Sequence, residues 1–255
     1  MAEHRLEAVA EEPRQVSEEP RQVAARLHVI ITAAGSSRRL GVNKLLLPLG
    51  GAPVLVRTCQ VFQELDLVAD IVITAPAGLE DEYARLLKSH HLTKVAQVVT
   101  GGAERQDSIY QAMLALKANA SDYVAVHDAA RPLISAALVE KICRALDNAD
   151  GAIPAVAVKD TIKRVDAEGL VLETLVRSEL RAVQTPQIFR FGPLLAAYNR
   201  AQQERYLGTD DASLIEYMGG KVRVVEGDYR NIKVTTVEDI AAMERFWEEL
   251  HGRNV

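Results

Sequence analysis

The sequence predicts an α/β protein built on a mostly parallel β-sheet, and two observations support this fold class. First, short runs rich in β-branched residues alternate with stretches of helical periodicity from about residue 28 to residue 148. Second, this alternation is typical of βαβ units, in which crossover helices keep neighbouring strands parallel and cover both faces of the sheet. The length of 255 residues and a hydrophobic content of 48% fit one large domain better than two small ones.

The expected strands and helices follow one another in a regular order. Strands are expected at HVIITAA, DIVITA, AQVVTGG and DYVAVHDAA. Helices are expected over residues 53–64, 80–89, 108–117 and 136–148. A strand at KVRVVEG and a helix over residues 237–250 close the domain. Because ligands of such sheets bind beyond the carboxyl ends of the strands, we expect the functional site there.

The segment over about residues 157–185 interrupts this order. Two alternating stretches flank the turn-like residues 166–169, and no helical stretch separates them. We therefore expect a protruding β-hairpin arm. Because an arm of this length would bury little surface against its own domain, we expect it to pack on a second copy of the chain in a symmetric homodimer.

The first 27 residues are expected to be a disordered extension, followed by a catalytic domain over residues 28–255. The extension is polar and contains the near-repeat EEPRQV-S-EEPRQV, so it offers too little apolar surface to offset the entropy of ordering it. A helix that binds a partner is the alternative for this segment.

Composition excludes several classes of function. A formal net charge of -5 argues against broad binding of nucleic acid or anionic membranes, which needs an extended basic face. No run approaches the roughly 18 to 20 apolar residues of a membrane span, and the chain does not open with a signal peptide, so a cytoplasmic location is expected. Cys59 and Cys143 lack the spacing of metal ligands and are interpreted as small core residues.

A candidate phosphate-binding loop follows the first strand. The segment AAGSSRRLGVNK combines small residues, which let backbone N–H groups approach a ligand, with Arg38, Arg39 and Lys44 within ten residues of Gly35. It is neither a Walker loop nor a dinucleotide-binding fingerprint. On this motif alone, an ordinary turn with solvated basic residues is an equal alternative.

Six ordered segments resemble the 2-C-methyl-D-erythritol 4-phosphate cytidylyltransferase family. They are AAGSSRRLGVNK, TGGAERQDSIYQAM, VAVHDAARP, VKDTIKR, VQTPQIF, and GTDDASLIEYMG together with NIKVTT. The resemblance implies a Rossmann-like nucleotidyltransferase domain whose arm is used for dimerisation. It also implies transfer of CMP from CTP to a polyol phosphate, with Mg²⁺ as cofactor and pyrophosphate as the second product.

The resemblance further implies roles around CTP. The nucleotide-binding positions are Ala33, Ala34, Gly35, Gly102, Ser108 and Asp128. Of these, Gly102 and Ser108 would contact the cytosine, and Asp128 would contact the ribose or Mg²⁺, which prefers carboxylate and phosphate oxygens. Arg39, Lys44 and Lys233 would be catalytic, because they stabilise charge at the α-phosphate.

A second set of positions would bind the acceptor. By resemblance this set is Arg131, Thr161, Arg177, Thr185, Thr209 and Lys233. Thr161 and Arg177 lie in the arm and would reach across the homodimer, so that the two subunits exchange arms at their active sites. No general base is needed, because the acceptor phosphate is already largely dianionic at neutral pH.

Some positions depart from the pattern of the family, and others are interpreted as structural. Ser37 and Leu40 stand where the family commonly has glycine and methionine, and Arg181 replaces a frequent tryptophan. His127 is interpreted as structural, because adjacent strand residues point to opposite faces. Asp210 and Asp211 resemble a metal-binding pair, but the favoured interpretation is the N-cap and first-turn acid of a helix over ASLIEYM.

Three alternative functions share this fold. A ribitol-5-phosphate cytidylyltransferase would use the same CTP loop with another polyol phosphate. A sugar-nucleotide pyrophosphorylase for another nucleotide is disfavoured by TGGAERQDS, which resembles a cytosine-reading loop. A regulator without catalysis is disfavoured by the cations expected on both sides of the α-phosphate.

Overall fold

The computed structural model describes residues 25–35 and 43–252. Most of the expected N-terminal extension therefore lies outside the described residues, as do Ser37, Arg38, Arg39 and Leu40. The first strand begins at Leu27, which is already buried. The division into an extension and a domain stays a prediction.

One eight-stranded sheet forms the centre of the protein, and its order is β10-β7-β11-β6-β1-β4-β5, with β12 also paired to β7. The strands are β1 (Leu27–Thr32), β4 (Val68–Ala75), β5 (Val95–Thr100), β6 (Tyr123–Asp128), β7 (Gly151–Ala157), β10 (Arg181–Val183), β11 (Gln187–Arg190) and β12 (Val222–Glu226). Four pairs are parallel, namely β1 with β4, β1 with β6, β4 with β5, and β12 with β7. Antiparallel β10 and β11 join the other half. The expected mostly parallel α/β fold is confirmed.

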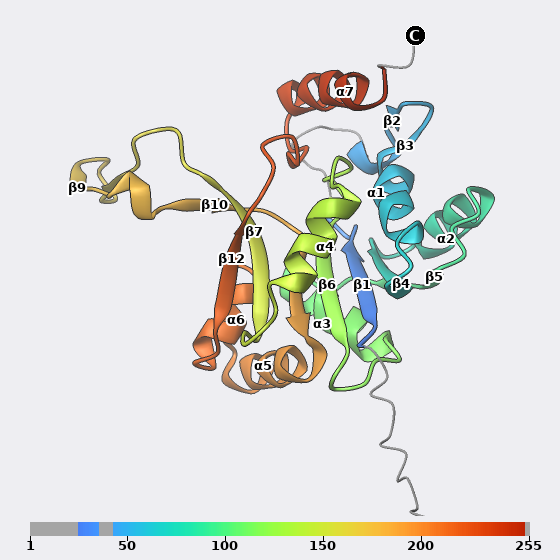
Figure 1. Ribbon diagram of the computed structural model, residues 1–255, viewed down its shortest axis with the longest axis horizontal. Coiled ribbons are helices and arrows are strands. Elements are labelled where there is room, and N and C mark those ends of the chain that lie inside the picture. The colour runs from blue at the N-terminus through green and yellow to red at the C-terminus, as the bar shows by residue number, and fades with distance from the viewer. Residues whose placement is uncertain (1–24, 36–42, 253–255) are drawn as a thin grey trace, which may run out of the picture.

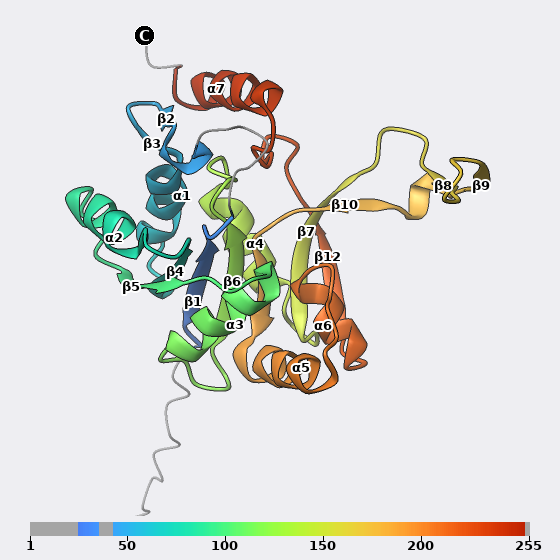
Figure 2. The ribbon, with the colours of Figure 1, turned by 180° about the vertical axis from the view of Figure 1, so that it is seen from behind.

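Seven α-helices of the described chain surround this sheet (Figures 1 and 2). They are α1 (Val54–Gln63), α2 (Glu80–Ser89), α3 (Arg105–Ala115), α4 (Ala136–Arg144), α5 (Phe191–Glu204), α6 (Asp211–Tyr217) and α7 (Val237–His251). In the two views α1 and α4 cover one face, α3, α5 and α6 cover the other, and α7 lies above the carboxyl ends of β1 and β6. A short ribbon of β2 (Pro48–Leu49) and β3 (Ala52–Pro53) precedes α1.

Alternation along the strands divides the core between the two faces. In β1, Val29 and Ile31 pack in the cluster that contains Phe62 of α1, whereas Ile30 packs in the cluster that contains Met113 of α3. Each such side chain contributes about 1.5–3 kcal/mol when it is fully buried. Because side chains alternate between the two faces along each strand, alternate residues of a strand pack against the helices of opposite faces.

Both cysteines lie in helices that pack on the core. Cys59 is buried in α1, where burial raises the pKa of its thiol well above the usual range. Cys143 is partly buried in α4, and burial raises its pKa to about 11. Both are core residues, as expected. Across the described ranges, no helix combines the length and apolar character that a membrane crossing requires.

The arm is a hairpin that projects from the sheet (Figure 1). Antiparallel strands β8 (Lys163–Val165) and β9 (Val171–Thr174) form it, and a 3₁₀ turn, Arg177–Glu179, leads back to β10. Gly169 adopts a positive φ of 85°, which suits the expected turn. The hairpin is confirmed, and packing on a second copy of the chain stays a prediction.

Candidate active site

A cavity of about 600 Å³, here called the main pocket, lies at the carboxyl ends of β1 and β6. Its walls contain Thr32, Ala33, Ala34, Gly35, Lys44, Leu45, Thr74, Gly102, Ala103, Glu104, Arg105, Ser108, Asp128, Ala130, Lys233 and Thr235. All six residues expected to bind the nucleotide are among them, together with two of the three expected catalytic residues. The third, Arg39, lies outside the described residues and stays a prediction.

The loop after β1 is fixed against the neighbouring strand. The N–H of Ala33 donates to the carbonyl oxygen of Thr74 at 3.0 Å and lies 3.2 Å from its hydroxyl oxygen. A Cβ atom added at Gly101 would lie only 2.3 Å from Cβ of Ala34, so the glycine permits this close approach of β5 to the loop. Ala34 and Gly35 thus lie at the wall of the main pocket, in a loop that packs closely against the end of β5.

The loop before α3 forms another part of the wall. The N–H of Gly102 donates to Oγ of Ser108 at 3.0 Å, and this hydroxyl donates to the carbonyl oxygen of Glu104 at 3.0 Å. Cβ of Asp107 would lie 2.3 Å from a Cβ atom added at Gly102. Ser108 therefore shapes this loop through its side chain.

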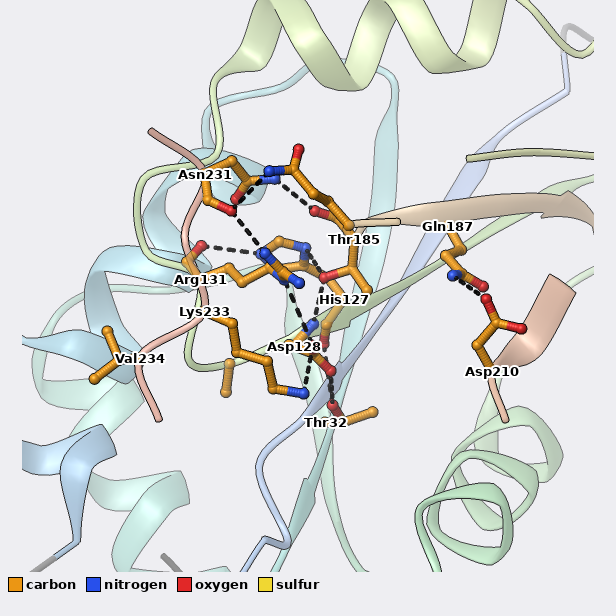
Figure 3. A network of polar contacts seen from close by, with 12 residues as sticks. Thr32, His127, Asp128, Arg131, Thr185, Gln187, Asp210, Asn231, Lys233 and Val234 are labelled. Carbon is orange, nitrogen blue, oxygen red and sulfur yellow. Dashed lines mark hydrogen bonds and ion pairs between the residues drawn. The ribbon is translucent and has the colours of Figure 1, made fainter. Parts of the chain in front are cut away.

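Asp128 ends β6 at the centre of the charged groups (Figure 3). Its Oδ2 lies 2.8 Å from Nζ of Lys233 and 3.6 Å from Nε of Arg131, and its Oδ1 lies 3.6 Å from Nε of Arg105. Burial alone would raise the pKa of this carboxyl, but the three cations outweigh burial and hold the pKa well below its usual range. Asp128 is therefore ionised near neutral pH.

Two lysines from distant parts of the chain meet at this pocket. Asn43 caps the short 3₁₀ helix Lys44–Leu46 by accepting from the N–H of Leu45. Nζ of Lys44 then donates to the carbonyl oxygen of Val234 at 2.7 Å, next to Lys233. The two expected catalytic lysines thus line the same cavity.

His127 connects Asp128 to the rest of the network (Figure 3). Burial lowers the pKa of His127 to about 4, so the ring is neutral near pH 7. Its Nε2 donates to the carbonyl oxygen of Arg131 at 3.1 Å, which leaves Nδ1 to accept from the hydroxyl of Thr185 at 3.0 Å. The same hydroxyl accepts from the N–H of Asp128 at 3.0 Å. The structural interpretation of His127 is confirmed.

Thr185 and Arg131, both expected to bind the acceptor, are occupied with internal contacts. Thr185 is only 6% exposed, and its carbonyl oxygen accepts from Nδ2 of Asn231 at 2.9 Å. Arg131 donates to the carbonyl oxygen of Asn231 at 2.7 Å and pairs with Asp128. Both residues hold the segment before Lys233 against the sheet, and neither lines the main pocket.

The remaining acceptor positions are dispersed in a single chain. Thr209 lines a smaller cavity of about 170 Å³, here called the side pocket, which shares Glu104 and Arg105 with the main pocket. Thr161 and Arg177 are exposed on the arm, where Arg177 donates to the carbonyl oxygen of Lys159 at 2.8 Å. Neither of these arm residues lines the main pocket of its own chain.

Comparison with known proteins adds to this geometry. A model of the family described as 2-C-methyl-D-erythritol 4-phosphate cytidylyltransferase matches residues 27–249. The chain belongs to this family. The resemblance found in the six sequence segments is thereby confirmed.

Curated cytidylyltransferases and solved structures agree with that assignment. The protein of this name from Geobacter metallireducens is 42% identical to the chain, and the match covers 86% of this chain and 97% of that protein. The one from Geobacillus kaustophilus is 44% identical, and the match covers 84% of this chain and 94% of that protein. The crystal structure titled 4-diphosphocytidyl-2C-methyl-D-erythritolsynthase from Anaerococcus prevotii superposes with a TM-score of 0.78 at 31% identity, covering 88% of this chain and 96% of that one. The 2-C-methyl-D-erythritol 4-phosphate cytidylyltransferase of Thermus thermophilus has a TM-score of 0.70 at 30% identity, covering 88% and 99%.

Sequence reasoning did not single out Arg105, which is the first residue of α3. Nη2 of Arg105 pairs with Oδ2 of Asp211 at 2.8 Å, and Asp211 is fully buried. Asp210 is the N-cap of α6, as expected, and accepts from the N–H of Ser213 at 2.9 Å. Asp211 is in the first turn, but its main partner is Arg105. No local pattern indicates a pair that is 106 residues apart.

Arg181, which departs from the cytidylyltransferase pattern, is accommodated at the root of the arm. Its Nη1 donates to the carbonyl oxygens of Ser178 and Leu180 at 2.9 and 2.8 Å. The side chain thus binds the 3₁₀ turn beside it, so the local backbone is supported without a tryptophan.

Proposed function

We propose that this protein transfers a cytidylyl group from CTP to 2-C-methyl-D-erythritol 4-phosphate, which gives 4-diphosphocytidyl-2-C-methyl-D-erythritol and pyrophosphate in the non-mevalonate route to isoprenoids. The observation that carries this proposal is the meeting of the family's loop, its acid and its two lysines at one cavity. Gly35, Lys44, Asp128 and Lys233 all line the main pocket. Relatives that carry this activity in their names match over most of their length.

The chemistry follows from the charges at the main pocket. An oxygen of the acceptor phosphate attacks the α-phosphorus of CTP, a new P–O bond forms, and the bond to the bridging oxygen of the β-phosphate breaks as pyrophosphate leaves. The attacking group needs no base, because it is already an anion. Lys44 and Lys233 offset the repulsion between the two phosphates and stabilise the charge that grows in the transition state.

A magnesium ion fits this site if it is bound together with the triphosphate. Residues 25–35 and 43–252 contain no cluster of three or more His, Cys, Asp or Glu side chains that could hold a metal. Asp128 and Glu104 are the carboxylates at the wall of the main pocket. Mg²⁺ is commonly bound by one or two carboxylates plus substrate phosphates, so we propose Asp128 as its protein ligand. When bound, the ion would neutralise phosphate charge.

The acceptor half of the site is proposed to need a homodimer. In one chain, Thr161 and Arg177 are exposed on the arm and do not line the main pocket. A second copy would bring its arm to this pocket and place an Arg177 near the acceptor phosphate, where a guanidinium binds two oxygens at once. The cytoplasmic location and the exclusion of nucleic-acid and membrane partners stay predictions.

The test is pyrophosphate release by the purified protein with CTP and Mg²⁺. 2-C-Methyl-D-erythritol 4-phosphate and ribitol 5-phosphate are compared as acceptors at equal concentration. We expect turnover of the first and little of the second. Selective turnover of ribitol 5-phosphate would contradict the proposed acceptor, and replacement of CTP by UTP or ATP without loss of rate would contradict the proposed nucleotide.

A further inference from the structure

Arg105 occupies an unusual position for a basic residue. It is the first residue of α3, where the positive end of the helix dipole disfavours a cation. Its side chain nevertheless lines both the main pocket and the side pocket. Some other interaction must therefore hold the guanidinium at this place.

Asp211 and Tyr198 supply that interaction from α6 and α5. Oδ2 of Asp211 accepts from Nη2 of Arg105 at 2.8 Å, and Oδ1 accepts from the hydroxyl of Tyr198 at 2.5 Å. Asp211 has no exposed surface, and Tyr198 is also buried. The desolvation of a buried ion pair offsets most of its attraction, so a contribution to stability alone does not account for this arrangement.

The guanidinium also borders the main pocket, where the carboxylate of Asp128 lies near it. Nε of Arg105 lies 3.6 Å from Asp128, and the side chain is 33% exposed. Within the described part of the chain, no hydrogen bond or ion pair is formed by Nη1. Asp211 therefore holds Nη2 and the carboxylate of Asp128 lies near Nε, which leaves the Nη1 group for an anion in the main pocket.

We propose that Arg105 is a further nucleotide-binding residue that contacts phosphate oxygens of CTP, and that Asp211 and Tyr198 are positioning residues that hold it there. The inference rests on the proposed function, because it takes CTP as the ligand. A nucleoside triphosphate carries roughly four negative charges, and the guanidinium adds a positive charge to the lining that also contains Lys44 and Lys233.

The direct test is the affinity of the Arg105→Gln variant for CTP. Isothermal titration calorimetry with CTP and Mg²⁺, without acceptor, separates binding from catalysis. We expect the Kd for CTP to rise about tenfold or more, as for the loss of one charge-assisted contact. An unchanged Kd in a variant whose parent binds and turns over CTP would overturn this inference and leave the proposed function intact. Failure of the parent to bind CTP would contradict both.

A double variant separates ligand binding from folding. Arg105→Gln alone leaves Asp211 buried without its cation, which can destabilise the protein. Arg105→Gln combined with Asp211→Asn removes both charges and keeps the packing. We expect its melting temperature to return toward that of the parent while the Kd for CTP stays raised. Recovery of CTP affinity together with stability would show that the pair is only structural.

The positioning role of Tyr198 is tested by comparison with Tyr110, on which its ring stacks. The rings of Tyr198 and Tyr110 are nearly parallel, with centroids 6.2 Å apart, but the hydroxyl of Tyr110 donates to Asn199 at an exposed position. Tyr198→Phe should weaken CTP binding about two- to fivefold, as expected for the loss of one hydrogen bond to the anchoring carboxylate. Tyr110→Phe is the matched control and should leave it unchanged. Equal effects of the two substitutions would contradict the positioning role.

Discussion

The main pocket and the arm are built in opposite ways. At the main pocket, Asp128 is paired with three cations and His127 is buried among fixed partners. On the arm, large apolar side chains that are each more than half exposed follow one another closely. They are Val165, Leu170, Val171, Leu172 and Val176. The charged groups described at the pocket thus have partners within the chain, whereas the apolar side chains of the arm are exposed.

This difference separates the two halves of the proposed reaction. We expect a single chain to hold the nucleotide, because the charged groups of the main pocket are already oriented by buried hydrogen bonds. The arm displays apolar surface that a soluble monomer would not keep exposed, and it carries two expected acceptor ligands. Changes at the pocket should therefore alter chemistry, and changes on the arm should alter acceptor binding and assembly.

The largest effect is expected from Lys44→Ala. We expect kcat to fall by about a hundred- to a thousandfold, with the KM for CTP changing far less, because the lysine acts mainly on the transition state. Steady-state kinetics in both substrates measures this. Lys88→Ala, at an exposed position of α2, is the control and should be neutral. An unchanged kcat would contradict the role of Lys44 in the pocket.

The burial of His127, next to Asp128, should affect how the free energy of unfolding depends on pH. The folded pKa of His127 is about 4 against an ordinary value of 6.5, so the unfolded chain binds more protons between these values. The stability due to neutral His127 is complete above pH 6.5 and is lost as the pH falls toward 4, by roughly 3 kcal/mol. His127→Gln removes this titration.

Urea unfolding at several pH values measures that change. The difference in unfolding free energy between the parent and His127→Gln should shrink by roughly 3 kcal/mol from about pH 7 to about pH 4. His90→Gln, at the end of α2, serves as the control. A difference that does not vary with pH would mean that His127 is not held neutral by the fold.

The next effect concerns the arm. Arg177→Ala should raise the KM for the acceptor about ten- to a hundredfold and leave the Kd for CTP nearly unchanged, because a guanidinium that binds phosphate is lost only from the acceptor half. Arg164→Ala is the control, since Arg164 pairs with Glu173 on the same arm. Weakened CTP binding by Arg177→Ala would contradict the division between pocket and arm.

Mixed dimers sharpen this test. When Arg177→Ala subunits are combined with Lys44→Ala subunits, one of the two sites in a heterodimer receives an intact pocket and an intact arm if arms are exchanged. Activity should then exceed that of either variant alone. With subunit exchange verified by mass, no recovery would place the arm at the pocket of its own chain.

Helix positions show how far the sequence could be interpreted. The helix expected over residues 80–89 has those bounds, whereas the one expected over residues 108–117 begins at Arg105, because Glu104 and Asp107 form a capping box. The helix α5 was not expected. Its Gly192 and Pro193 suggest a break in the chain, but they lie in the first turn, where proline is tolerated because the N–H groups there have no partner within the helix.

The candidate site also has one part that the sequence could predict and another part that it could not. Loops such as the one at Gly35 and the strand end at Asp128 are contiguous motifs, and the topology of the sheet brings their ends to one edge. The anchoring of Arg105 by Asp211 joins helices far apart in the chain, and the use of the Thr185 hydroxyl inside the protein depends on the position of His127. Such contacts depend on tertiary packing, so composition and periodicity could not indicate them.

The smallest effect is expected at the apolar surface of the arm. Leu172 is 55% exposed in one chain, and Leu172→Asp would place a charge in the interface that we predict there. We expect the dissociation constant of the homodimer to rise about tenfold or more, measured by sedimentation velocity over a concentration series. Leu114→Asp on α3 is the matched control, since Leu114 is 58% exposed and lies away from the arm. If both variants kept the dimer of the parent, the apolar face of the arm would not be its interface, and the acceptor site would have to be completed by another surface.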